Sequence, residues 1–440
     1  MKTIPIQPLS NGGRRPVASP ISELPGSKVR WQLSTLLQAP HRLSFAAGVT
    51  ILAVSSLWWA LLLSLSTMGI PVHWAVPRPI AHSVLMAFGY MPLFFIGFLF
   101  TAGPKWLGHP AVEARALLRP VATYVFAWLG YMVAVHLDAD TAAVCVALAA
   151  AAWTSVVVAF VRMVTRSRAA DRIHAKLVLV GTLTGAFALW CIPLALALEA
   201  FTVARVAVLV GIWGCMAIVY VAVSHRMIPF FTANVVPMLN AWRPMWLLGV
   251  FVGVIGLELL FSILDLTVWP LGATVRFVQT SLELASAAVL LTMAVKWGLM
   301  QSLRARLLAM LHVGFLWLGL AVLLQAISHG LMFATDDALS LGLAPTHALT
   351  MGFMGATLFA MATRVSAGHS GRHLVADDLI WTLFWIQQIA TVLRIVAAVW
   401  PSSPPWLTPL AASLWASASV SWALRYGLWY GRPREDGKPG

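Results

Sequence analysis

Two histidines stand near the starts of long apolar segments, where an imidazole is well placed to do chemistry. His82 opens the run IAHSVLMAFGYMPLFFIGFLFTAG, and His347 opens HALTMGFMGATLFAMATR. A neutral ring nitrogen binds haem iron or copper without bringing negative charge into a medium of low dielectric constant. A histidine in such a segment is therefore a candidate ligand. The alternative is a ring that only hydrogen-bonds a carbonyl at a helix end.

The surroundings of these two histidines are alike in sequence. Each is followed four residues later by a methionine, Met86 or Met351, and then by glycine. If both segments are helices that cross a membrane in the same direction, His82 and His347 lie at one depth. Two such rings can bind one haem from opposite sides. His312 is a third candidate haem ligand, placed deeper on the other side of the membrane.

A second candidate metal site is predicted near the opposite membrane surface. His312 lies in MLHVGFLWLGLAVLL, which offers it no local polar partner, while His369 and His373 are four residues apart in a Gly/Ser-rich loop. The alternative for that pair is a solvated loop. The predicted metal-binding set is His225, His369, His373 and His41, beside His312. His109 and His174 read as ordinary loop residues, and His329 as part of a loop at the other surface.

Four further charged residues fall inside apolar segments and need partners there. Glu258 and Arg276 occur at similar depths in adjacent antiparallel segments, which favours an ion pair between them. Glu283 is a candidate proton-relay group. Arg394 is a candidate partner for a haem propionate or for Glu283. A purely structural polar contact is the alternative for each.

The composition indicates the elements that position these residues. The chain has 440 residues, of which 60% are hydrophobic and 10% charged. Soluble domains are roughly a quarter charged. We therefore predict an all-α polytopic membrane protein with about twelve transmembrane helices and no sizeable soluble domain. The predicted spans are about 44–68, 80–103, 117–136, 141–161, 177–198, 204–223, 245–263, 271–295, 306–326, 343–363, 379–400 and 405–426.

The basic residues predict how the chain is oriented. The net charge of +14 comes from Lys and Arg in short gaps between apolar runs, so it indicates contact with the lipid bilayer and not nucleic acid. With both termini in the cytoplasm, the cytoplasmic loops carry most Lys and Arg, and Arg78 is the main exception. We predict a disordered basic tail over 1–40, one twelve-helix domain over 41–428 and a short basic tail over 429–440.

The three cysteines indicate neither a disulfide nor a thiolate metal site. Cys145, Cys191 and Cys215 each lie inside an apolar run, and the sequence has no Cys-x-x-Cys motif. They are expected to be small packing residues.

Five motifs in order resemble the NnrS family of bacterial inner-membrane proteins. They are HRLSF at His41, GFLFTAGPKWLG, SHRMIPFFTAN, LHVGFLWLGLA and HALTMGFMGATLFAMATRVSAGHSGRHL. The resemblance covers most of the chain from His41 onward. One departure is Ala81-His82-Ser83, where many members have His-x-His-Glu. The positions that match family motifs are His41, Arg226, His312, His347, Arg364 and His369.

The resemblance implies a multi-pass inner-membrane protein that contains haem and copper. It also implies a role in nitric oxide metabolism and resistance to nitrosative stress, with nitric oxide as a ligand and respiratory or denitrification membrane proteins as partners. It leaves open whether the protein catalyses a reaction. Two other readings stay open: a cofactor-free solute permease, and a membrane assembly or sensor partner of a denitrification complex.

Overall fold

The computed structural model describes residues 30–236, 242–400 and 402–437, and all regular elements in these ranges are helices. The first half contains α1 (Leu33–Leu36), α2 (Pro40–Thr67), α3 (Arg78–Phe88), α4 (Met91–Leu107), α5 (Ala114–Ala134), α6 (Ala139–Arg166), α7 (Ile173–Ala197), α8 (Phe201–Leu209), η1 (Val210–Ala217) and α9 (Ile218–Val235). The second half contains α10 (Met245–Thr267), α11 (Ala273–Lys296), α12 (Leu299–Ser302), α13 (Arg306–Ala334), α14 (Ala344–His347), η2 (Ala348–Gly355), α15 (Ala356–His369), α16 (Asp378–Val399) and α17 (Leu407–Tyr430).

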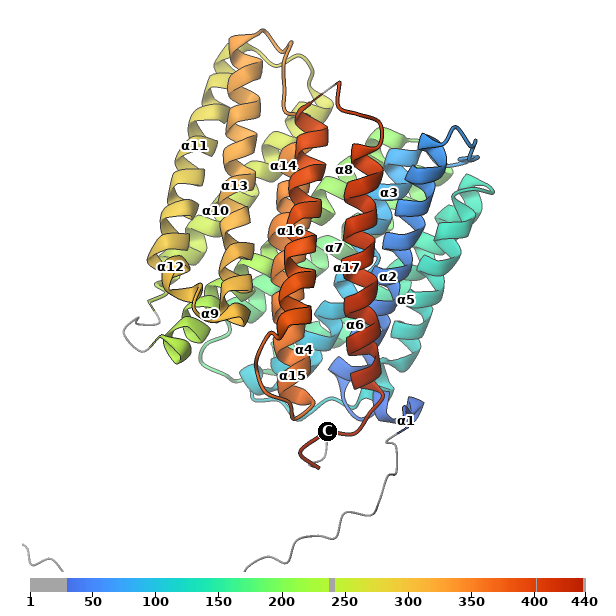
Figure 1. Ribbon diagram of the computed structural model, residues 1–440, viewed down its shortest axis with the longest axis vertical. Helices are drawn as coiled ribbons and strands as arrows, with labels where there is room; N and C mark the ends of the chain where they lie inside the picture. The colour runs from blue at the N-terminus through green and yellow to red at the C-terminus, as the bar shows by residue number, and fades with distance from the viewer. Residues whose placement is uncertain (1–29, 237–241, 401, 438–440) are drawn as a thin grey trace, which may run out of the picture. The chain divides into compact units, whose positions relative to one another are not determined.

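Eleven of the helical stretches in the described residues are long and apolar enough to cross a membrane. They correspond to the first eleven predicted spans, and three of them join shorter elements: α3 with α4, α8 with η1 and α9, and α14 with η2 and α15. The predicted all-α membrane fold is thus confirmed. The twelfth predicted span is the 24-residue α17, which is not among the eleven and packs along α2 and α16 (Figure 1).

The two ends of the described bundle meet, which requires an even number of passes. The amide of Gln32 donates to the carbonyl of Gly431 over 2.8 Å, and the Trp31 indole donates to Gly427. Eleven passes would leave these ends on opposite sides, so α17 completes twelve. We call the end at Trp31 and Gly431 the inner end and the opposite one the outer end, following the predicted orientation.

The predicted tails fall mainly outside what the structure tests. Residues 1–29 and 438–440 lie outside the described residues. Within the described part, α1 already forms before residue 40, and α17 extends to Tyr430. The boundaries at 40 and 429 therefore stay predictions.

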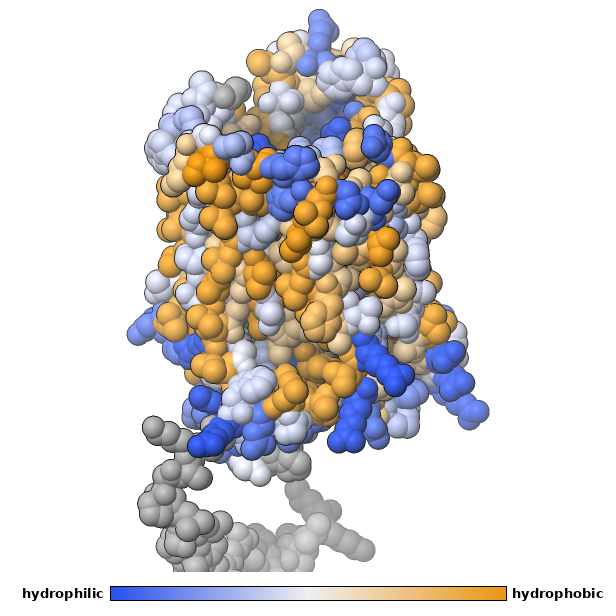
Figure 2. All heavy atoms as spheres, turned by 90° about the vertical axis from the view of Figure 1, so that its right-hand side faces the viewer, coloured by the Kyte–Doolittle hydropathy of each residue, from blue (hydrophilic) through white to orange (hydrophobic). Residues whose placement is uncertain are grey.

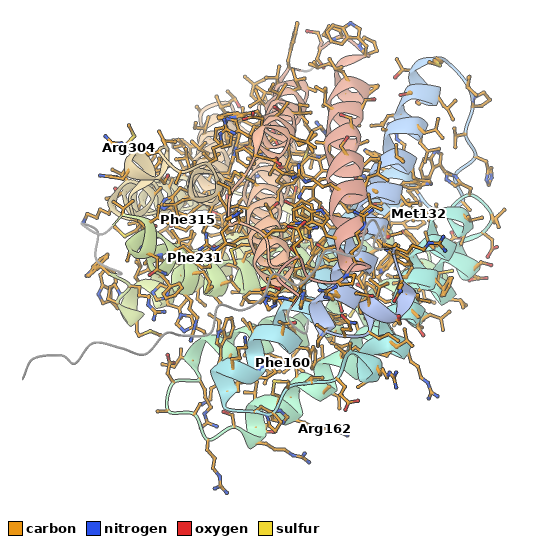
Figure 3. The ribbon with its side chains drawn as sticks, turned by 60° about the horizontal axis from the view of Figure 1, so that its bottom comes forward. Met132, Phe160, Arg162, Phe231, Arg304 and Phe315 are labelled. Atoms are coloured by element: carbon orange, nitrogen blue, oxygen red, sulfur yellow. The ribbon has the colours of Figure 1, made fainter. Side chains whose placement is uncertain are left out.

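The surface has the pattern that a bilayer favours. Figure 2 shows an apolar belt between two ends where hydrophilic residues gather. Large apolar side chains such as Phe126 (71% exposed) and Phe187 (68% exposed) are exposed in the middle of α5 and α7, where lipid would cover them. Figure 3 shows Arg162 and Arg304 pointing away from the bundle, while Phe315 points into it. A hydrophobic belt between two hydrophilic ends is what membrane-spanning proteins present.

Small residues let the helices approach closely, as expected where lipid removes the hydrophobic drive for helix association. α7 carries Gly181-x-x-x-Gly185, which packs against η1. A Cβ added at Gly185 would lie 2.5 Å from the Sγ of Cys215. Cys215 is fully buried there, in the packing role predicted for it.

Three spans are interrupted in the bundle interior. The span of α3 and α4 breaks at Gly89–Tyr90, and the Tyr124 hydroxyl donates to the carbonyl of Phe88 over 2.5 Å. Inside a membrane, a backbone group at a break needs such a partner. The spans of α9 and α15 each contain an eight-residue π-helix, η1 and η2, a feature that is frequent at functional sites.

Candidate functional site

The structure brings His82, His347 and Arg394 together near the outer end of the bundle. His82 lies on α3, His347 ends α14 and Arg394 lies on α16, and the three are close enough for their charges to interact. Arg394 forms no ion pair with any described carboxylate. The sequence predicted the two imidazoles at one depth, and named Arg394 only as a candidate partner for a haem propionate or for Glu283.

His347 is held in one tautomer. Its Nδ1 lies 2.8 Å from the carbonyl oxygen of Leu343, one turn earlier. Because a carbonyl only accepts, Nδ1 carries the proton and the neutral ring presents the Nε2 lone pair. A metal-binding histidine usually donates its other N–H to such an acceptor, which fixes the ring and increases its basicity. The carbonyl bond expected under the structural alternative is present, and it leaves the second nitrogen available.

His82 is positioned by an aromatic ring instead. It stacks on Trp59 of α2, with ring centroids 4.0 Å apart and planes 21° from parallel. Its Nδ1 is buried and has no hydrogen-bond partner. A buried ring nitrogen without a partner is costly unless it binds something the protein itself does not supply.

The two π-helices flank this site. η2 begins directly after His347, and η1 packs against α3, which carries His82. Gly352 of η2 lies so close to α13 that a Cβ would be 2.6 Å from the Trp317 ring, and a Cβ at Gly211 of η1 would lie closer still to the Phe88 ring. Both segments contain Gly-x-x-Gly (211–214 and 352–355). The repeated Gly-x-x-Gly could have marked the two π-helices in the sequence, but helical periodicity does not distinguish a π-turn from an α-turn.

The predicted inner metal set divides into separate pairs. His41 and His369 have ring centroids 4.2 Å apart at the inner end. His225 pairs with His174, whose Nε2 lies 3.0 Å from the Nδ1 of His225. The prediction that His174 is an ordinary loop residue is wrong, since it is 3% exposed. Sequence alone gave no sign of this partner, because α7 begins one residue earlier, in a charged segment.

Two histidines of the inner half have their protons fixed by neighbouring acceptors. His225 Nε2 donates to the carbonyl of Pro244, so its Nδ1 accepts from His174. The Thr232 hydroxyl donates to the backbone and therefore accepts from His312 Nε2 over 2.9 Å. The Nδ1 atoms of His174 and His312 are left buried without partners.

The structure does not bring the remaining predicted residues into one cluster. His373 is exposed and His312 contacts Thr232, so neither joins His369. Arg226 stacks on Trp106 at 4.7 Å and lies 3.9 Å from Asp171, and Arg364 lies over Phe231 at 3.9 Å. Within the described residues, no group of three or more His, Cys, Asp or Glu side chains is arranged to hold a metal.

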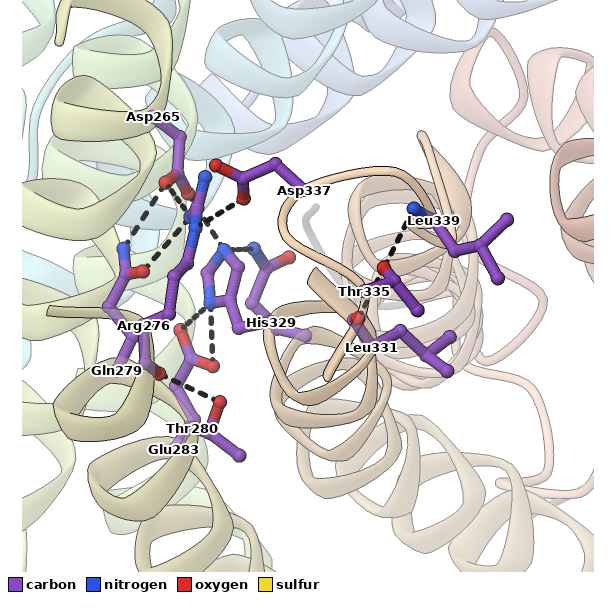
Figure 4. Close-up of polar contacts among 11 residues, drawn as sticks. Asp265, Arg276, Gln279, Thr280, Glu283, His329, Leu331, Thr335, Asp337 and Leu339 are labelled. Atoms are coloured by element: carbon purple, nitrogen blue, oxygen red, sulfur yellow. Dashed lines mark hydrogen bonds and ion pairs between the residues drawn. The ribbon is translucent and has the colours of Figure 1, made fainter. Parts of the chain in front are cut away.

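A second polar region occupies the outer half of α10, α11 and α13 (Figure 4). His329 lies 2.8 Å from Glu283 through Nδ1 and 2.8 Å from Asp265 through Nε2. Arg276 pairs with Asp265 and Asp337, at 2.5 and 2.8 Å. The predicted ion pair of Glu258 with Arg276 is therefore wrong.

The assignment of His329 to an outer loop is also wrong. α13 continues to Ala334, eight residues beyond the predicted end, and His329 is 2% exposed. The polar residues SHG made the span look complete at 326, yet the helix stays buried because Asp265 and Glu283 supply partners. One signal was present: Arg276, Gln279 and Glu283 recur at helical spacing on one face of α11.

Comparison with known proteins gives one family. The family model described as NnrS protein matches residues 35–434, which is most of the chain. No curated protein matches the chain.

Proposed function

The chain belongs to the NnrS family, and on that premise we propose that it is a haem-binding protein of the bacterial inner membrane that acts in nitric oxide metabolism and resistance to nitrosative stress. The observation that carries the proposal is His347, a neutral ring with its Nε2 lone pair available, beside a second histidine and an arginine without a carboxylate partner. Nitric oxide is the proposed ligand, and denitrification or respiratory membrane proteins are the proposed partners.

These residues fit haem in their chemistry. The Nε2 of His347 would bind the iron, and His82, whose Nδ1 has no partner, is the second histidine that would hold the group. Arg394 would pair with a propionate, since no described carboxylate forms an ion pair with it. Haem iron supplies the nitric oxide binding, and the ligand geometry decides whether one face stays open to it.

Copper is the second proposed metal. His41 and His369 would hold it, because they are the histidine pair of the predicted inner set that the structure places ring against ring. Imidazole suits copper. Thr101 lies 3.4 Å from His41 Nδ1 and helps to orient that ring.

The test is the visible spectrum of the detergent-purified full-length protein, oxidised and dithionite-reduced, with haem supplied during expression. We expect a Soret band that H347A removes. Loss with H82A as well would indicate two axial histidines, and retention with H82A would indicate a five-coordinate haem open to nitric oxide. H373A is the matched control, since His373 is exposed and should leave the band unchanged.

Two outcomes oppose the proposal. A band that survives both H347A and H82A would place haem elsewhere, with H312A as the next variant to test. No band in the native protein would remove the cofactor and make a cofactor-free permease, or an assembly partner, the leading function.

A further inference from the structure

We propose that Arg42, Arg372 and Arg432 form a binding site for a phosphate group at the inner end of the bundle. The group belongs to the head of an anionic phospholipid or to a soluble phosphate. The site lies where α2 begins and where α15 and α17 end (Figure 1). It is separate from the histidine pair on α3 and α14 and does not rest on a bound metal.

Arg42 is a buried cation that lacks a carboxylate partner. It is the third residue of α2 and is 2% exposed. Its Nη1 donates to the carbonyl oxygens of Tyr430 and Arg432, over 3.1 and 2.7 Å, whereas its Nε is buried and has no hydrogen-bond partner. None of the described carboxylates forms an ion pair with it. Because carbonyl groups carry only partial charges, this buried cation still favours an anion nearby.

Two further arginines leave a buried donor unused. The Nη1 of Arg372 and the Nε of Arg432 are buried and have no hydrogen-bond partner. Contacts connect both residues to Arg42. The carbonyl of Arg432 accepts from Arg42, its amide donates to the carbonyl of Trp429 over 3.1 Å, and the guanidinium of Arg372 lies over the Trp429 ring at 4.1 Å. The three arginines are thus gathered around the end of α17, and each has a donor that the protein itself does not satisfy.

The charges at this end do not balance among the described residues. The two carboxylates of the segment after α17 each pair with an arginine: Glu435 with Arg372 at 2.7 Å, and Asp436 with Arg434 at 2.6 Å. Arg42 and Arg432 pair with no carboxylate in the described part of the chain. Two positive charges are therefore left for an anion.

A phosphate group suits these donors and this place in the membrane. Guanidinium groups match phosphate oxygens in charge and in the geometry of their N–H donors. The site is level with the ends of the spans, and the indole of Trp31, which is 44% exposed, donates to Gly427 of α17 there. Tryptophans gather at the membrane–water interface, and basic pockets between helices on the cytoplasmic side bind phospholipid head groups. A phospholipid head is therefore the favoured source of the phosphate.

Glu435 holds one of these arginines in the absence of the anion. Its side chain is 59% exposed, whereas that of Arg372 is 16% exposed. An ion pair that reaches water contributes little to stability, so it is easily exchanged. A phosphate group can replace Glu435 at Arg372, and removal of this carboxylate should strengthen binding of the anion.

The test is thermal unfolding of the full-length protein in detergent at constant ionic strength. The additives are phosphatidylglycerol, phosphatidylcholine or inorganic phosphate. A ligand that binds the folded state raises the midpoint of unfolding. We expect a rise with phosphatidylglycerol and none with phosphatidylcholine, whose head has no net charge. An equal rise with inorganic phosphate would identify a soluble phosphate as the ligand, and a rise with phosphatidylglycerol alone would identify the lipid head.

Variants show whether the rise comes from this site. We expect R372Q and R432Q each to weaken the apparent affinity for the anion severalfold, and E435Q to strengthen it. R304Q is the matched control, because Arg304 is exposed at the same end and points away from the bundle (Figure 3). Arg42 stays unchanged in these variants, because it also holds the end of α17.

Each rise is measured from the variant's own midpoint without additive, so a change in basal stability does not enter the comparison. No rise with either phosphate source, or an equal rise in R304Q and in the double variant R372Q/R432Q, would overturn the site. A rise in E435Q no larger than in the native protein would overturn the competition by Glu435.

Discussion

His329 and His347 both lie in the outer half of the bundle, yet they differ in what their ring nitrogens contact. Both nitrogens of His329 lie against carboxylates, whereas His347 donates one N–H to a backbone carbonyl and keeps the other nitrogen available. The first histidine is fully used by the protein. The second has a lone pair to offer to something else. The partners of each nitrogen, more than residue type or depth, separate a charge-carrying histidine from a candidate ligand.

The charges around the two histidines differ in the same direction. His329 stands among Asp265, Glu283 and Glu258, so its region gathers acids. Beside His347 the nearby charge is the cation Arg394. That region suits a ligand that bears carboxylates, such as haem. The two regions are therefore complementary to ligands of opposite charge.

The largest effect is expected from H329A, which removes the histidine between Asp265 and Glu283. It leaves Asp265 and Glu283 without their shared partner, one of them almost fully buried. Breaking a buried ion pair by removing one partner costs about 3–5 kcal/mol. We therefore expect H329A to unfold in detergent at a lower temperature than the native protein.

H373A is the control for that variant, because His373 is exposed and should change the midpoint little. The double variant H329A/E283Q sharpens the result, since neutralising the orphaned acid should recover part of the loss. Equal midpoints for H329A and H373A would contradict the ion-pair assignment.

The fold and the first histidine pair were predictable because they follow from long-range regularities. Hydropathy and loop charge set the number of passes and their direction, so His82 and His347 had to lie at similar depth. The pairing of His174 with His225 and the reach of α13 to His329 were not predictable in this way. Both depend on which helices are neighbours, and hydropathy alone leaves that open.

The charged residues show the same limit more directly. Depth alone paired Glu258 with Arg276, because they lie on adjacent spans. The structure instead places Asp265 and Asp337 around Arg276, within 2.5 and 2.8 Å. Asp265 and Asp337 looked like solvated loop residues, since the sequence shows only that they end apolar runs. Local chemistry identified that partners were needed but not which ones.

An intermediate effect is expected from G352A, which disturbs the packing of η2 next to His347. The new Cβ would lie 2.6 Å from the Trp317 ring, and that ring is held by a 2.8 Å hydrogen bond to Gln388. Overpacking of this kind costs about 1–3 kcal/mol. Because η2 begins at the residue after His347, the change should also weaken haem binding, measured by the height of the Soret band.

G249A is the matched control for the glycine variant. Gly249 lies in α10 with nothing within 4 Å of its added Cβ, so only the gain in helix propensity, up to about 1 kcal/mol, applies. We expect G249A to be neutral or stabilising in the same thermal assay. If G352A matched G249A in both stability and haem content, η2 would have no role in positioning His347.

The smallest effect is expected at Asp377, a charged residue that is exposed to water. Its loss serves as a reference for the changes in the two buried regions. Asp377 caps α16 by accepting from the amide of Ile380 over 3.1 Å, and both of its oxygens accept from Arg425 of α17. Partial burial opposes its ionisation, but the hydrogen bonds from Arg425 and Ile380 prevail and lower the pKa of its carboxyl. D377N keeps the cap and loses the ion pair, so we expect a cost of about 0.5 kcal/mol, as its side chain is 50% exposed.

The pH dependence makes this last variant specific. Because the pKa of Asp377 is lower in the folded state, its ionised form stabilises the protein above the pKa of the unfolded chain, and that contribution is lost as the pH falls through the folded value. The thermal midpoints of native protein and D377N should therefore differ at neutral pH and converge in acid. An offset that persists in acid would show that the asparagine disturbs the helix cap and that the charge contributes nothing measurable. Only the ion pairs in the buried regions would then contribute measurably to stability, because water cannot replace a missing partner there.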